Sequence, residues 1–171
     1  MALAKQYLER AIALWALIGG VLLLLIVGAT VVNALGFTAN AIAKLWGGNV
    51  SGLPGYEDGV TLLIGVAALA MFPYCQLHQG HAVVDVFMMR ASARLNKTIF
   101  LLSTTLTIAL ALALGYMSVL GTVQMRSDAV ETAVLGWPVW VFAATALPSC
   151  LLWAAATILQ FLNAKERHDG P

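Results

Sequence analysis

Four long stretches without a single charged side chain constrain what this chain can fold into. They cover residues 11–32, 59–77, 98–123 and 132–164. A helix needs about 20 apolar residues to cross the roughly 30 Å hydrocarbon core of a bilayer. Because 61% of the 171 residues are hydrophobic and only 10% are charged, a soluble core of this size could not bury so much apolar surface. The sequence therefore predicts an integral membrane protein.

The predicted fold is a single all-α membrane domain, residues 1–171, with transmembrane helices over about 11–33, 59–77, 98–123 and 138–162. The first run exceeds the roughly 7 to 15 apolar residues of a signal peptide, so we expect it to be retained as a span. The last stretch is too long for one minimal span, and Pro138 suits the first position of its helix. Residues 35–46 have one apolar helical face, and they either extend the first span or lie in the interface.

A polar segment containing Gly80, His81 and Asp85 interrupts the centre of the chain. Over residues 82–96, apolar side chains recur at helical spacing between polar and basic ones. This pattern predicts a short amphipathic helix that lies in the membrane interface. Three basic residues of this region are expected to face phospholipid headgroups and to mark the orientation of the chain: Arg90, Arg94 and Lys97.

Lysine and arginine are divided unequally between the two sides of the predicted membrane domain. If the N-terminus is inside, the inner side carries Lys5, Arg10, Arg90, Arg94, Lys97, Lys165 and Arg167, and the outer side carries only Lys44 and Arg126. The positive-inside rule then predicts that both termini are cytoplasmic. The outer loops contain Glu57, Asp58, Asp128 and Glu131. A formal net charge of +1 offers no basic excess for a nucleic-acid partner.

The sequence shows no catalytic, cofactor-binding or metal-binding constellation. His81 and Asp85 stand four residues apart at the interface, where only His78 is near enough to be a third ligand, so we expect a structural role. Cys75 and Cys150 stand alone and are expected to pack as small apolar side chains. Ion-coupled carriers keep ionisable residues inside the membrane, whereas these spans have none. The pattern favours a non-enzymatic protein that packs against a larger membrane partner.

Other polar and aromatic side chains of the spans predict contacts. Trp137 and Trp140 fit an aromatic belt at the membrane interface, and Trp153, nearer mid-span, is expected to pack against another helix or lipid. A group of hydroxyl residues in the third span indicates a face that meets another helix: Ser103, Thr104, Thr105 and Thr107.

Two motifs carry a family resemblance. Gly80-His81-Ala-Val-Val-Asp85 follows the second span, and Glu131-Thr132-Ala-Val-Leu135-Gly-Trp-Pro138-Val-Trp140 looks like a Thr-x-x-Leu-x-x-Pro-x-Trp entry to the last span. Together with the four-span layout, they resemble the small membrane subunit, the DctQ-like component, of tripartite ATP-independent periplasmic (TRAP) transporters. The resemblance covers nearly the whole chain.

The resemblance implies a non-catalytic subunit of a secondary transporter that takes up organic acids and is driven by an ion gradient, with sodium as the coupling ion. It implies two partners in or at the bacterial or archaeal cytoplasmic membrane: a large DctM-like subunit, which the chain would scaffold, and a periplasmic substrate-binding protein. Candidate docking residues for the latter are Glu57, Asp58, Asp128 and Glu131. One alternative is a four-span quinone-linked thiol oxidoreductase, which would need Cys75 and Cys150 as a reactive pair. Another is a small scaffold of a different membrane complex.

Overall fold

The computed structural model describes residues 2–78 and 93–169. These residues form α1 (Ala2–Ala43), a short 3-10 helix η1 (Lys44–Trp46), α2 (Tyr56–Leu77), α4 (Ala93–Ser127), α5 (Val139–Ala144) and α6 (Ala146–Asp169). Four helical segments are long and apolar enough to cross a membrane, with α5 and α6 together forming the last one. The prediction of four helices that are long and apolar enough to span a membrane is thereby confirmed. Residues 82–92 of the predicted interfacial helix lie outside the described residues, and residues 93–96 belong to the first turn of α4.

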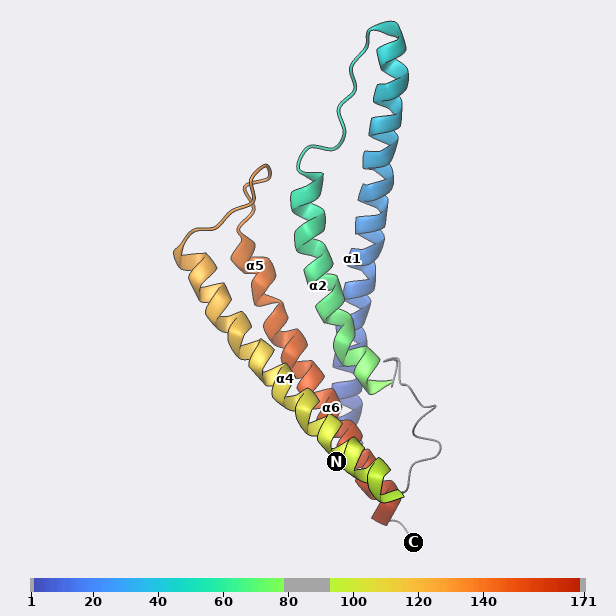
Figure 1. Ribbon diagram of the computed structural model, residues 1–171, viewed down its shortest axis with the longest axis vertical. Coiled ribbons are helices and arrows are strands. Elements are labelled where there is room, and N and C mark those ends of the chain that lie inside the picture. Colours follow the sequence, from blue (N-terminus) through green and yellow to red (C-terminus); the bar gives the residue numbers. More distant parts are fainter. Residues whose placement is uncertain (1, 79–92, 170–171) are drawn as a thin grey trace.

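The long helices alternate in direction (Figure 1). α1 and α4 begin at the end of the molecule where α2 and α6 finish, and we call this the terminal end. The connections 47–55 and 128–138 lie at the opposite end, which we call the loop end. This alternation agrees with the predicted layout, in which both termini share one side of the membrane.

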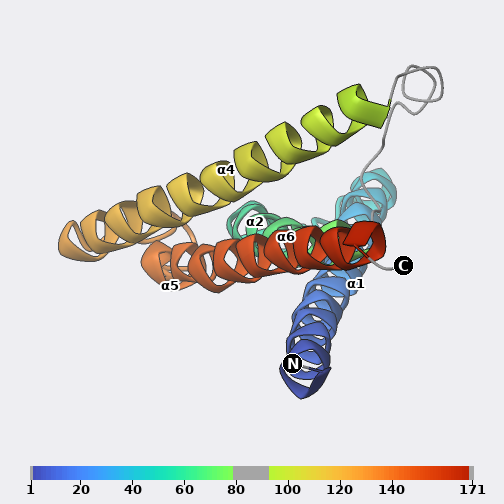
Figure 2. The ribbon, with the colours of Figure 1, turned by 90° about the horizontal axis from the view of Figure 1, so that it is seen from below.

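α6 is the helix on which the others assemble. It packs against α1, α2 and α4, whereas the main contacts of α4 are with α5 and α6. Small buried side chains, including Ser149 and Ala154, let these neighbours approach closely. The Trp15 indole of α1 donates a hydrogen bond to the Ser149 hydroxyl over 2.9 Å. Figure 2 shows the result, with α1 and α4 on opposite sides of α6 in an open arrangement.

α1 is one continuous helix of 42 residues, about 63 Å long at about 1.5 Å per residue. Residues 35–43 therefore extend the first helix, which decides between the two alternatives that the sequence left open. Its buried edge is formed by Ile12, Gly19 and Ile26, spaced seven residues apart. At Gly19 the two backbones nearly touch, since an added Cβ would lie 3.0 Å from the Ala67 carbonyl oxygen of α2.

The last span contains a break that was not predicted. Pro138 is the N-cap of α5 and thus stands one residue before the first helical position, and Thr145 separates α5 from α6. Pro148 has no N–H to donate to the preceding turn, so an unbroken helix would lose a hydrogen bond there. The Thr145 hydroxyl donates to the Phe142 carbonyl over 2.6 Å and tightens the turn. By contrast, α2 continues through its fully buried Pro73.

Only part of the predicted contact face of the third span is buried. Thr104 is buried. Ser103 and Thr105 are exposed, and their hydroxyls donate to the carbonyls of Phe100 and Leu101 in their own helix over 3.0 and 2.9 Å. Hydroxyl groups in an apolar helix can satisfy themselves in this way, so their presence alone does not identify a helix interface.

Candidate functional site at the loop end

Residues 130–139, which we call the entry loop, fold around Thr132. The Thr132 N–H donates to the Trp137 carbonyl over 3.0 Å, and the Thr132 hydroxyl oxygen accepts from the Trp137 N–H over 3.0 Å. Gly136 closes the turn with a φ of 63°, which a side chain would oppose. The Val139 N–H then donates to the Val130 carbonyl over 3.0 Å. The entry loop is therefore an ordered turn, and Thr132 bonds within it through both backbone and side chain.

Asp58 joins the start of α2 to the entry loop. Its Oδ2 accepts hydrogen bonds from the backbone N–H groups of Val134 over 2.7 Å and Leu135 over 3.1 Å, across 76 residues of sequence in the first case. Hydrogen bonds to an ionised acceptor are the stronger kind. The Leu135 side chain packs directly over Gly55, where an added Cβ would lie 2.6 Å from the Leu135 Cγ. The entry loop is thus bound to the start of α2 by the hydrogen bonds of Asp58 and by the packing of Leu135 on Gly55.

The remaining residues of the second motif connect α4 to α5. Pro138 has extended backbone angles, with φ −70° and ψ 111°, and turns the chain into the first residue of α5. The Arg126 guanidinium in the last turn of α4 lies 5.0 Å from the centre of the Trp140 ring, a cation–π distance. Trp137 stacks on Phe142 with 5.8 Å between ring centres. These contacts leave the predicted interfacial role of both tryptophans untested.

The other connection, residues 47–55, lies along α1. The Asn33 side-chain oxygen accepts from the Leu53 N–H over 3.0 Å, and the Asn40 oxygen accepts from the Val50 N–H over 3.1 Å. The hydroxyls of Thr30 and Tyr56 are 2.9 Å apart, which fixes the level of the start of α2 against α1. Sequence reasoning missed these positions. The available signal was two asparagines seven residues apart in a long uncharged stretch, residues 11–43.

The four acidic residues predicted for docking are not equivalent. Glu57, Asp128 and Glu131 are exposed, whereas Asp58 is engaged by the entry loop. Glu57 and Asp58 border a pocket of about 310 Å³ between α1, the 47–55 connection and the entry loop. The apolar wall of that pocket includes Phe37, Leu53 and Val134. The loop end therefore presents carboxylates at a pocket whose wall is partly apolar.

At the terminal end the structure describes only part of the predicted site. Lys97 is exposed near the start of α4, and Arg94 belongs to its first turn. The positions of the other residues named for this end lie outside the described residues: Gly80, His81, Asp85 and Arg90. Their predicted structural and headgroup roles remain predictions.

An amide cluster between α2 and α6, which the sequence analysis did not single out, lies close to the terminal end. The Gln76 Nε2 donates to the Gln160 Oε1 over 2.7 Å, and the Trp153 indole donates to the Gln76 Oε1 over 3.2 Å. The Gln160 amide also donates to the Gln76 carbonyl oxygen, one of the last carbonyls of α2, which have no partner within the helix. Trp153 packs edge-on against Phe72 with 5.2 Å between ring centres, which confirms its predicted helix contact.

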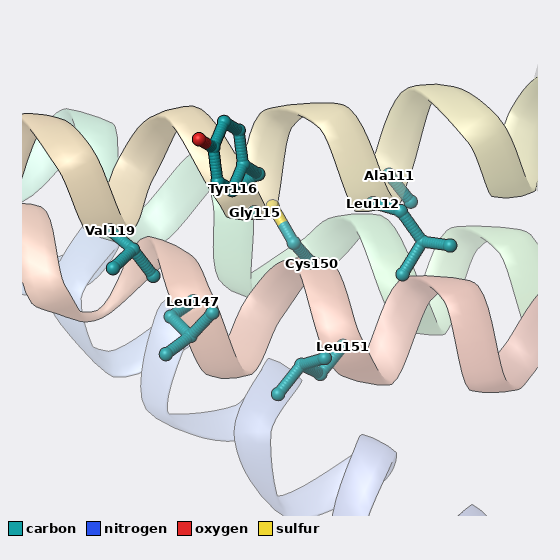
Figure 3. A pocket seen from close by; sticks show the side chains of 8 residues that line it. All are labelled: Ala111, Leu112, Gly115, Tyr116, Val119, Leu147, Cys150 and Leu151. Carbon is teal, nitrogen blue, oxygen red and sulfur yellow. The ribbon is translucent and has the colours of Figure 1, made fainter.

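The two cysteines occupy packing positions. Cys75 of α2 is half-buried, Cys150 of α6 is buried, and both are free thiols. Cys150 faces Gly115 of α4, where an added Cβ would lie 3.3 Å from the Cys150 Cβ. It lines a small apolar groove of about 110 Å³ between α4 and α6 (Figure 3). Cys150 therefore serves as a small side chain that lets two helices approach, as expected.

Asp58→Ala is expected to loosen the entry loop. Trypsin provides the measurement, because Arg126 is the only lysine or arginine between residues 98 and 164. Without the carboxylate, two backbone N–H groups of the loop lose their acceptor, and cleavage after Arg126 should accelerate several-fold in detergent, since cleavage follows local opening. Glu57→Ala, which removes a neighbouring exposed carboxylate, is the matched control. Equal cleavage rates for the two variants would contradict this role of Asp58.

The fold and the loop end define the class: a small helical protein with four helices long and apolar enough to span a membrane. At one end, one connection is hydrogen-bonded to α1 and the other to the start of α2. The family model of the DctQ component of tripartite ATP-independent periplasmic transporters matches residues 34–167. The chain belongs to this family. No significant match was found among curated proteins or among solved structures. The family assignment makes the chain the small permease component of a TRAP transporter, a class whose components also include a DctM subunit and a binding protein.

Proposed function

We propose that the chain is a non-catalytic scaffold for the large DctM-like subunit of a sodium-coupled TRAP transporter for organic acids. We place it in the bacterial or archaeal cytoplasmic membrane with both termini and the terminal end cytoplasmic, so that the loop end faces the periplasm. The observation that carries this proposal is the sparse packing of the spans. In the most apolar window of each span, at most 33% of the residues are buried within the chain.

α4 illustrates how much span surface is free for a partner. Within the span, its buried positions form a narrow stripe of small residues, Thr104, Ala111 and Gly115, that faces α6. The rest of α4 is mostly exposed, including the large side chains of Leu102 and Leu106. In membranes, helices associate through packing, and lipid can cover whatever remains. Because the four helices bury so little of their surface against one another, much of it is free to contact a partner, which supports a scaffolding role.

We further propose that the loop end contributes to docking of the periplasmic substrate-binding protein. Glu57, Asp128 and Glu131 supply an exposed negative charge, and Asp58 positions the entry loop that carries Glu131. Complementary charge mainly raises the association rate and sets the register of a complex. A binding protein with a basic rim would therefore be guided to this end.

Affinity purification tests the scaffolding role. A tagged chain, co-expressed with its large membrane subunit and extracted in mild detergent, should recover that subunit in about equal amount. Recovery of the chain without any large membrane partner would refute the proposal.

The docking role is tested on the same purified complex. The variant Glu57→Lys/Asp128→Lys/Glu131→Lys should keep the large subunit but slow association of the purified periplasmic binding protein by about tenfold at low salt. The difference should shrink as salt screens the charges. Glu9→Lys, a charge reversal at a half-buried position in the N-terminal part of α1, is the control. An unchanged association rate in the triple variant would disprove the docking role while leaving the scaffold intact.

A further inference from the structure

The pocket between α1, the 47–55 connection and the entry loop, which we call the loop-end pocket, is built from three parts of the chain. α1 supplies Phe37 and the 47–55 connection supplies Leu53. The start of α2 supplies Glu57 and Asp58, and the entry loop supplies Val134. Its volume of about 310 Å³ is near the lower limit of roughly 300 Å³ for ligand pockets. The loop-end pocket can therefore admit one long side chain or a small molecule.

Contacts within its own walls hold the loop-end pocket in shape. The Asn33 side-chain oxygen accepts from the Leu53 N–H and fixes the 47–55 connection to α1. Gly52 lets the two approach closely, because a Cβ added there would lie 2.8 Å from the Asn33 Oδ1. On the other side, Asp58 accepts from the Val134 N–H and fixes the entry loop to α2. A site whose walls are already bonded to one another loses little entropy when a ligand enters.

The two carboxylates of the loop-end pocket are not neutralised by a cation of the described residues. The hydrogen bonds to the Asp58 Oδ2 come from uncharged backbone N–H groups, so this side chain keeps its negative charge. Glu57 is exposed and forms no ion pair with a described lysine or arginine. Arg126, a cation of the same end, lies over the Trp140 ring instead. The loop-end pocket therefore favours a positively charged ligand.

The apolar part of the wall narrows the choice of cation. Phe37 is 63% exposed, Leu53 46% and Val134 65%, so these side chains are free to contact a ligand. The side chain of arginine or lysine buries an aliphatic stem along apolar surface and keeps a cationic head at its end. Arginine fits better than lysine, because its planar guanidinium binds carboxylates through two N–H groups and stacks on aromatic rings such as that of Phe37.

We propose that the loop-end pocket receives one arginine side chain of the periplasmic substrate-binding protein, with the guanidinium at Glu57 and Asp58 and the aliphatic stem against Phe37 and Leu53. The proposal rests on the docking role proposed above and divides it into two tasks. The exposed acids outside the pocket guide the approach, and the pocket holds the docked protein. In protein interfaces a few side chains seated in pockets, arginine prominent among them, carry most of the binding energy.

Dissociation kinetics test the loop-end pocket as an anchor. The tagged chain is immobilised in complex with its large subunit, and the periplasmic binding protein is added and then washed away. Glu57→Gln, which removes one charge from the pocket, should speed dissociation by about tenfold or more. The effect should persist at high salt, because salt screens a partly buried ion pair only weakly. Glu131→Gln, the same change at an exposed position outside the pocket, should slow association and leave dissociation within about twofold.

Filling the loop-end pocket tests it without a change of charge. Leu53→Trp enlarges an exposed side chain of the pocket wall, and Val50→Trp enlarges an exposed one in the same connection but outside the pocket. Leu53→Trp should speed dissociation by about tenfold or more, whereas Val50→Trp should behave like the unaltered chain. Equal recovery of the large subunit by both variants shows that both are folded. If dissociation is equally slow from both variants, nothing enters the pocket and the proposal fails.

Photo-crosslinking identifies the occupant of the loop-end pocket. A diazirine amino acid of about the size of leucine, placed at Leu53, should crosslink to a segment of the binding protein that contains an arginine. Alanine in place of that arginine should speed dissociation as Glu57→Gln does, and the two changes together should have much less than their combined effect. Crosslinks mainly to the large subunit, to a second copy of this chain or to lipid would overturn the proposal.

The kinetic outcomes distinguish the pocket from the docking role. If Glu57→Gln and Glu131→Gln both slow association and neither speeds dissociation, the loop-end pocket is no anchor and the docking role stands. If the binding protein does not associate with the unaltered complex, both proposals fail.

Discussion

Gly19→Leu is expected to separate α1 from α2 and to destabilise the isolated chain more than any other single change considered. A Cβ at this position would already lie 3.0 Å from the Ala67 carbonyl oxygen and 3.0 Å from the Ala70 Cβ. Both contacts involve atoms that cannot rotate away, so a leucine can fit only if the helices move apart. We expect the free energy of unfolding to fall by at least the roughly 1–3 kcal/mol that overpacking a core costs.

Thermal unfolding of the purified chain in detergent, followed by tryptophan fluorescence, measures this loss. Gly65→Leu is the control, because no atom lies within 4 Å of a Cβ added to Gly65 of α2. The control should keep or slightly raise the melting temperature, since Leu is a better helix former than Gly. Equal melting temperatures for the two variants would show that α1 and α2 do not meet at Gly19.

Gln76→Leu is expected to be the second most destabilising change, because it breaks the amide cluster at its centre. The substitution leaves the Trp153 indole N–H without its acceptor and the Gln160 Oε1 without its donor, both between helices. Interhelical hydrogen bonds in membrane proteins contribute about 0.6 to 2 kcal/mol each. Removing two of them should therefore cost roughly 1 to 4 kcal/mol. Thermal unfolding in detergent measures the loss, with Gln124→Leu at an exposed position of α4 as the control.

A double-mutant cycle separates this network from a general effect of polarity. Gln76→Leu/Gln160→Leu removes both amides at once, so fewer groups are left unpaired than the two single variants imply. The double variant should therefore cost less than the sum of the single variants, with a coupling of about 0.5 kcal/mol or more. Strict additivity would mean that the two amides act independently.

The fold was largely predictable from the sequence because each uncharged run is long enough to span a bilayer by itself. The details that were missed depend on local backbone chemistry. The break at Thr145 arises because Pro148 lacks an N–H, and a stretch that is apolar throughout does not reveal which turn absorbs the defect. The extension of α1 to Ala43 was left open, since one apolar helical face fits both a projecting helix and an interfacial one.

The candidate site was less predictable, because its key contacts are made by backbone atoms. From the sequence, Asp58 was predicted to be a docking residue of an outer loop. Its actual partners are the N–H groups of Val134 and Leu135, and no pattern of side chains encodes a backbone donor so far along the chain. The motif around Thr132 drew attention to the entry loop. The structure shows that Thr132 bonds within this loop through both its backbone and its side chain. The amide cluster was overlooked because Gln76 and Gln160 are isolated in apolar runs.

The amide cluster and the entry loop have a joint mechanical consequence. Gln76 and Gln160 clamp α2 to α6 close to the terminal end, and Asp58 clamps the start of α2 to the segment that leads into α5. Because α2 and the last span are joined near both ends, they resist bending and sliding more than two helices without such contacts. α2 and the last span would then move relative to a partner as one rigid pair. It could serve as a fixed frame of reference against which a neighbouring subunit changes its position in the membrane.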